Sequence, residues 1–181
     1  MEIGLVSLLR SRDARVERQR ELLSLYPDMT LLCLTVIIPG SVKRNDNSLR
    51  IARAGMAAVR EAFQTVYEEQ RDLDTGFEAF FIVDMPPLDA KRLACRIEDT
   101  HPLGRLMDLD VVVSDSCKDS NQDDGQAAAL PVPLSRGSIG LAPRRCLICD
   151  RPAKECMRSR AHPTEELLKK IDELLENGLN P

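Results

Sequence analysis

The chain has 181 residues, of which 43% are hydrophobic and 30% are charged, a balance typical of a folded globular protein. The net charge of -4 and an aromatic content of only 3% argue against nucleic acid as a partner. The longest apolar run, 31–38, is too short to cross a bilayer, and the first fifteen residues lack the apolar stretch of a secretory signal. We therefore expect a cytoplasmic protein without membrane contact, with reduced cysteines and one domain over 1–181.

The first two thirds of the chain contain a series of predicted helices and strands, identified by helical or strand-like spacing of their apolar residues. They are, in chain order, a helix over 5–26, a strand over 29–38, a helix from 45–48 to about 64, strands over 66–72 and 77–84, a helix over 88–99 and a strand over 105–113. After the first helix, this order is the split βαβ pattern. It predicts an α+β fold with a ferredoxin-like βαββαβ sheet core and an added N-terminal helix.

The last third of the chain has a different composition. Residues 114–133 are rich in Asp, Ser, Gln, Ala and Pro, which predicts a mobile loop. Residues 144–160 are rich in cysteine and arginine, and Thr164 is a suitable N-cap for a following amphipathic helix with two glutamates in its first turn. We expect this C-terminal Cys/Arg segment and helix, 144–181, to pack on the same domain.

The segment 101–110, HPLGRLMDLD, carries the first candidate site. On a strand, Asp108 and Asp110 point to the same face, while Met107 and Leu109 point to the other face, toward the helices. Two carboxylates on an open sheet face can hold Mg²⁺, which prefers oxygen ligands and substrate phosphates. The alternative is an ordinary solvated strand face.

The predicted topology suggests which loops join this pair. We expect the third strand of the sheet to run parallel to the first, so that the ends of both meet the start of the fourth at one rim. That arrangement would bring Gly40, Ser41 and Lys43 next to Asp84 and to residues 101–105. A glycine-containing loop with a lysine can offer backbone donors and positive charge to phosphates.

A second candidate site lies near the C-terminus. Cys146, Cys149, Cys156 and His162 have a spacing that permits a tetrahedral Zn²⁺ site with three thiolates and one imidazole. A surface loop with reduced thiols and a redox-active Cys-x-x-Cys pair are the alternatives, although no thioredoxin-like context surrounds the cysteines. Basic residues outnumber acidic ones by six to two over 144–160, which indicates an anion site or a solvated loop.

Both candidate segments carry a resemblance. Residues 101–110 and the stretch from Arg145 to His162 resemble the two signature segments of the citrate lyase holo-[acyl-carrier-protein] synthase family, also called apo-citrate lyase phosphoribosyl-dephospho-CoA transferases. The opening helix with Arg12, Arg15 and Gln19, the strand ending before Gly40 and the final helix are also similar to that family.

The resemblance implies a nucleotidyltransferase. Such an enzyme moves the 2′-(5″-phosphoribosyl)-3′-dephospho-CoA group from triphosphoribosyl-dephospho-CoA to a serine of the citrate lyase acyl carrier protein (gamma chain), and releases diphosphate. The other hypothesis is a zinc-stabilised module that docks on a partner protein without chemistry.

Phosphate transfer of this kind needs neutralised charge, positioned groups and removal of a hydroxyl proton. We expect Asp108 and Asp110, with Asp84, to hold Mg²⁺, Arg105 to clamp a phosphate, and His101 or a carboxylate to act as the base. The residues predicted to bind substrate are Gly40, Ser41, Lys43, Gly104, Arg144, Arg145, Arg158 and Ser159.

Overall fold

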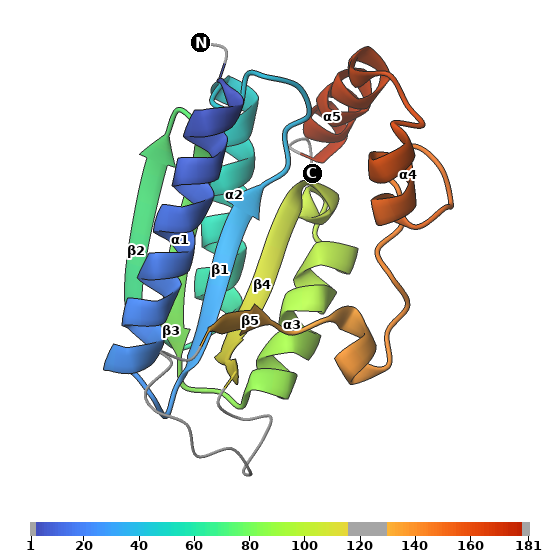
Figure 1. Ribbon diagram of the computed structural model, residues 1–181. Coiled ribbons are helices and arrows are strands. Elements are labelled where there is room, and N and C mark those ends of the chain that lie inside the picture. Colours follow the sequence, from blue (N-terminus) through green and yellow to red (C-terminus); the bar gives the residue numbers. More distant parts are fainter. Residues whose placement is uncertain (1–2, 116–129, 179–181) are drawn as a thin grey trace.

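The computed structural model describes residues 3–115 and 130–178, and its centre is one antiparallel β-sheet (Figure 1). The strands lie in the order β2-β3-β1-β4-β5, and every neighbouring pair is antiparallel. Their bounds are β1 Thr30–Val36, β2 Thr65–Leu73, β3 Gly76–Val83, β4 Met107–Ser114 and β5 Pro131–Pro133.

The helices begin where the sequence offers start signals. Asn45 and Ser48 form a reciprocal capping box before α2, and Pro87 is the first residue of α3, where its missing N–H costs nothing. The bounds are α1 Leu5–Leu25, α2 Asp46–Ala62, α3 Pro87–Thr100, α4 Ala153–Ser159 and α5 Thr164–Gly178. All of the helices and strands predicted up to residue 113 are present with small shifts at their ends, and the chain is of the mixed α/β class.

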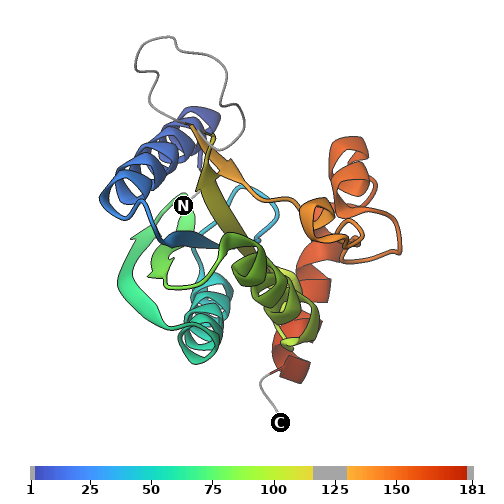
Figure 2. The same cartoon turned by 90° about the horizontal axis from the view of Figure 1, so that it is seen from below.

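Helices lie on both faces of the sheet (Figure 2), and the sheet separates two hydrophobic clusters. Helices α2, α3 and α5 cover one face, where buried residues such as Leu34, Met107 and Ile171 form the larger cluster. Helix α1 covers the other face, where Leu22 packs with Cys33 and other strand residues in the smaller cluster. The α1 face is therefore partly covered, and the expectation of an open sheet face is wrong in this respect.

The direction of β3 corrects the predicted topology. β3 pairs antiparallel with β1, with Thr30 opposite Val83, so the end of β3 meets the start of β1. The hairpin after β2 reverses the chain and inserts β3 between β1 and β2. Asp84 therefore lies at the opposite end of the sheet from Gly40, and the predicted convergence of Asp84 with the other site residues is wrong.

The region predicted as a mobile loop, 114–133, is only partly described. Ser114 ends β4, and Pro131–Pro133 form β5, with Val132 opposite Val113, so these positions belong to the sheet instead. The remaining predicted loop, 116–129, lies outside the described residues. Within the described ranges, no helix has the length and apolar composition needed to cross a membrane.

Candidate active site

The carboxylate pair lies on β4 as the alternation of its residues predicts. Asp108 and Asp110 are opposite Thr35 and Cys33 of β1 and share the α1 face, while Leu109 between them is fully buried on the other face. The side chains of Asp108 and Asp110 are 47% and 45% exposed, so both remain reachable beside α1.

A cavity of about 280 Å³ opens between α1, β4 and β5. Two contacts hold α1 on the sheet beside this cavity: Arg15 Nε donates to Glu78 Oε2 at 2.6 Å, and Gln19 Nε2 lies 3.3 Å from Cys33 Sγ. The cavity therefore combines two arginines with one carboxylate. The lining residues are Arg12, Arg15, Val16, Gln19, Asp110, Val112, Pro131 and Pro133.

Three of these lining residues were not assigned to the phosphate site from the sequence, although the arginine-rich face of their helix, with Arg15, was a candidate surface for docking the carrier protein. Arg12, Arg15 and Gln19 are on a helix whose arginines look like a solvated face, and their only signal was the family resemblance of that helix. In the structure, this helix and Asp110 of the family-like segment 101–110 line the same cavity.

Charged side chains from other elements cover the first part of β4 on the side where β5 pairs only with its last residues. Glu98 of α3 accepts from the Leu109 N–H at 2.8 Å, and Lys91 donates to the Leu109 carbonyl at 3.2 Å. Lys91 Nζ also lies 3.9 Å from Asp110 Oδ1, and Arg144 Nη1 lies 3.6 Å from Asp108 Oδ1. Each carboxylate thus has a cation beside it. Desolvation and the neighbouring Asp108 carboxylate raise the pKa of Asp110.

The guanidinium groups of Arg105 and Arg144 donate hydrogen bonds to backbone carbonyls. Arg105 Nη2 donates to the carbonyls of Arg145 and Cys146, at 3.0 and 2.6 Å, and Arg144 Nη2 donates to those of Gly104 and Met107, at 2.9 and 2.7 Å. The two arginines therefore tie the C-terminal segment to the start of β4. This arrangement differs from the phosphate clamp that we expected of Arg105.

His101 and Gly104 also have local structural contacts. His101 Nδ1 accepts from the Leu103 N–H at 3.0 Å, and burial lowers the pKa of His101. A Cβ atom on Gly104 would collide with the backbone carbonyls of Ile97 and Glu98, so close packing requires a glycine here.

The loop after β1 meets the start of β4 as predicted. The Ile37 N–H donates to the Leu106 carbonyl at 3.0 Å. Gly40 has a φ of 84°, which favours glycine, and Ser41 is exposed. Lys43 Nζ donates to the Ile38 carbonyl at 2.6 Å, and burial and the charge of Arg12 lower the pKa of Lys43.

The remaining predicted site residues lie elsewhere. Arg145 and Arg158 are exposed, with Arg145 3.2 Å from Asp150, and Ser159 Oγ donates to the Glu155 carbonyl at 2.8 Å. The exposed Asp84 borders another cavity, of about 360 Å³, at the far end of the sheet. The charged residues lining that cavity, Asp28 and Asp84, are both acidic, which makes it unsuited to phosphates.

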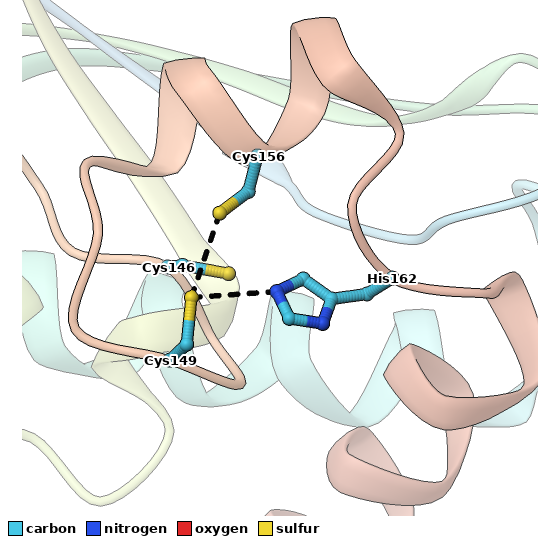
Figure 3. Close-up of side chains that lie close together, drawn as sticks. All are labelled: Cys146, Cys149, Cys156 and His162. Atoms are coloured by element: carbon cyan, nitrogen blue, oxygen red, sulfur yellow. Dashed lines mark hydrogen bonds between the residues drawn. The ribbon is translucent and has the colours of Figure 1, made fainter.

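The four predicted zinc ligands are gathered in one place (Figure 3). Cys149 Sγ lies 3.5 Å from Cys156 Sγ and 3.4 Å from His162 Nε2, and the donor atoms of all four residues lie within 4.8 Å of one another. Hydrogen bonds from the backbone and side chain of Arg151, and from His162, lower the pKa of Cys149 to about 6, while desolvation raises that of Cys156 to about 11. This group can hold a metal ion.

Enzymes that transfer phosphate groups commonly bind phosphate oxygens with arginines and hold metal ions with carboxylates, and this cleft contains both kinds of side chain. The family model described as "Apo-citrate lyase phosphoribosyl-dephospho-CoA transferase" matches residues 3–178. The chain belongs to this family, as its signature segments predicted.

Two relatives illustrate the similarity. A Streptococcus pyogenes serotype M18 protein is 35% identical over 181 residues, which cover 98% of this chain and 88% of the relative. A Vibrio cholerae serotype O1 protein is 37% identical over 180 residues, which cover 96% of this chain and 92% of the relative. Both are named "Probable apo-citrate lyase phosphoribosyl-dephospho-CoA transferase".

Proposed function

We propose that this protein transfers the 2′-(5″-phosphoribosyl)-3′-dephospho-CoA group from its triphosphate donor to a serine of the apo-citrate lyase acyl carrier protein. The serine oxygen forms a new bond to the α-phosphorus, the bond from phosphorus to the leaving oxygen breaks, and diphosphate departs. The enzyme is a nucleotidyltransferase acting in the cytoplasm. Its membership of the family and the chemistry of the α1–β4 cleft support this reaction.

The single observation that carries the site assignment is the shared cleft of Arg15 and Asp110. Together with Arg12, this cleft offers two guanidinium groups, which suit phosphate oxygens because their N–H donors form bidentate contacts. Arg15 is also held by the buried Glu78, so it is positioned before any donor binds. We assign the donor phosphates to this cleft, with Gln19 as an additional polar contact.

Lys43 and the loop of Gly40 and Ser41 extend the same proposal. Arg12 affects the pKa of Lys43, so the two cations lie near each other at the end of the sheet where β4 begins. We assign the diphosphate part of the donor to this side of the cleft. Positive charge there favours departure of the diphosphate, on which negative charge develops.

We propose Asp108 and Asp110 as the residues that hold Mg²⁺. Both side chains are half-exposed on one face of β4, and Mg²⁺ sites in proteins often consist of one or two carboxylates completed by substrate phosphates and water. When bound, the ion would supply positive charge to phosphate oxygens. Asp84 is not included, because it lies at the other end of the sheet.

The serine proton is assigned to a carboxylate of this pair rather than to His101. Because its lowered pKa keeps His101 neutral at pH 7 and Nδ1 accepts a hydrogen bond, the ring proton is on Nε2. The basic nitrogen of His101, Nδ1, therefore already accepts the hydrogen bond from the Leu103 N–H. Asp110 lines the cleft, so a carboxylate oxygen that the ion does not use is placed to accept the serine proton.

The fold that supports this site is proposed to be a ferredoxin-like βαββαβ core within one domain. The order β2-β3-β1-β4 and the antiparallel pairings of these strands support that assignment. In this arrangement the loop after β1 and the start of β4 are neighbours, which is the placement that the proposed donor site requires.

The function is tested by mixing the protein with apo carrier subunit and triphosphoribosyl-dephospho-CoA in the presence of Mg²⁺. We expect the mass of the carrier to rise by one phosphoribosyl-dephospho-CoA group as diphosphate appears. Asp110→Asn should lower turnover by about 100-fold or more, since it removes a charge from the reacting centre. The matched control is Asp84→Asn, an exposed carboxylate at the other end of the sheet, which should keep near-normal turnover.

The two parts of the proposal fail separately. An unchanged carrier mass with the unaltered protein would refute the transferase function. Transfer by the unaltered protein together with near-normal turnover of Asp110→Asn would leave the function intact and refute the site.

A further inference from the structure

We propose that Cys146, Cys149, Cys156 and His162 bind one structural Zn²⁺ ion. A tetrahedral zinc ion, with Zn–S bonds of about 2.3 Å and Zn–N bonds of about 2.0 Å, holds sulfur atoms about 3.8 Å apart and sulfur and nitrogen about 3.5 Å apart. The cluster already has sulfur–sulfur and sulfur–nitrogen distances of 3.5 and 3.4 Å, so an ion fits with small shifts of the side chains. On binding, the thiols lose their protons and coordinate as thiolates.

The backbone around the first two cysteines is preorganised for this role. The Cys146 N–H donates to the Arg151 carbonyl at 2.7 Å, and the Ala153 N–H donates to the Arg144 carbonyl at 2.8 Å. These bonds close a tight turn that directs both thiols of the Cys-x2-Cys pair inward, as Figure 3 shows. The turn therefore presents two ligands before any ion arrives.

The histidine is oriented by a carboxylate outside the cluster. His162 Nε2 faces Cys149, while His162 Nδ1 lies 3.4 Å from Glu166 Oε2 in the first turn of α5. Histidine ligands of zinc commonly give their other ring nitrogen to a carboxylate, which fixes the tautomer and orients the ring. Glu166 is placed for this second contact.

The small number of buried residues in this segment also points to a metal. In the stretch 141–163, all of which the structure describes, only Cys146 and Cys156 are buried. A segment of this size without a hydrophobic core usually depends on disulfides or a metal for its fold. The cysteines are free, and four protein ligands would complete the zinc shell, so the role is structural rather than catalytic.

Such an ion would connect the turn at Cys146, helix α4 and the start of α5. The turn is also anchored to β4, because Arg105 donates to the Cys146 carbonyl. Arg144, next to the turn, reaches Asp108. The zinc site would therefore set the position of the segment that borders the carboxylate pair.

The test begins with the metal content of full-length protein purified without chelators or metal-affinity resin. We expect about one zinc ion per chain by elemental mass spectrometry. Cobalt added to the metal-free protein should produce the intense thiolate-to-cobalt absorption of a tetrahedral site. Cys149→Ala should bind zinc at least tenfold more weakly, whereas the control Cys95→Ala, a buried cysteine of α3, should bind it normally.

Two outcomes would overturn the proposal. Less than about a tenth of an equivalent of zinc in the unaltered protein, with no cobalt absorption, would show a metal-free scaffold. A disulfide between Cys149 and Cys156, seen in peptide mass spectra of freshly prepared protein that does not bind cobalt, would show a redox pair. Both readouts use the unaltered protein, so they decide the question even if Cys149→Ala does not fold.

Discussion

Two regions border the carboxylate pair, and they are stabilised in different ways. The core beneath β1, β3 and β4 is apolar, and residues such as Leu34, Phe81 and Leu109 are fully buried there. The adjoining stretch 141–163 is held by hydrogen bonds from arginines to backbone carbonyls and by a cluster of cysteines with His162. The core therefore gives global stability, and the polar segment can be loosened without unfolding the sheet.

The largest effect is expected from a cavity in the core. Leu34→Ala removes a fully buried side chain of β1, which lowers the free energy of unfolding by about 2–5 kcal/mol. Urea denaturation followed by circular dichroism measures this change. The control is Leu168→Ala on α5, where the side chain is 38% exposed and a loss below about 1 kcal/mol is expected. Equal losses in both variants would contradict the conclusion that buried side chains of the core provide the global stability.

An intermediate and local effect is expected from Arg105→Ala. The change leaves the carbonyls of Arg145 and Cys146 without a charged donor, and hydrogen bonds to charged groups contribute about 1.5–3 kcal/mol when buried, less where water can replace them. Hydrogen exchange should become faster in 141–163 and stay unchanged in β1. Arg105→Lys, which keeps the charge and one reachable carbonyl, should show a smaller increase. Unchanged exchange in 141–163 would mean that Arg105 does not anchor this segment.

The same contrast explains how much could be predicted from the sequence. The faces of β4 followed from alternation, because Met107 and Leu109 are apolar and each is followed by an aspartate. The gathering of the cysteines followed from their spacing. Both are local patterns, and local patterns are where sequence reasoning is strongest.

What the sequence did not reveal depends on contacts between distant elements. Helix α1 has charged residues around most of its surface, so nothing in it indicates that Arg15 faces a buried glutamate of β3. Lys91 and Glu98 are almost fully buried, although both are charged, because each has a backbone partner on β4 in addition to charged neighbours. A backbone partner leaves no trace in the side-chain pattern, and this part of the site could be found only in the structure.

The smallest effect is expected where the two regions touch, at Glu98. This residue accepts from the Leu109 N–H and lies 3.2 Å from Arg136 and 3.8 Å from Arg144. Burial raises the pKa of Glu98 above its ordinary value of 4.5, even though Arg144, the Leu109 N–H and Lys91 oppose the shift. The native state therefore favours the protonated form, and the stability that Glu98 contributes is fully present below pH 4.5 and declines as the pH rises through its raised pKa.

Glu98→Gln tests this balance, because glutamine keeps an acceptor for Leu109 and cannot ionise. We expect a change in unfolding free energy of about 1 kcal/mol or less at pH 7, since the lost ion pairs offset the relieved cost of burying a charge. The free energy of unfolding of the variant, relative to that of the unaltered protein, should increase as the pH rises from 4 to 7. Only the unaltered protein loses stability by ionising Glu98. Urea denaturation at several pH values measures the difference between the two curves. A difference that moves in the opposite direction with pH would mean that Arg136 and Arg144 outweigh burial, and that the contact between the two regions is held by charge.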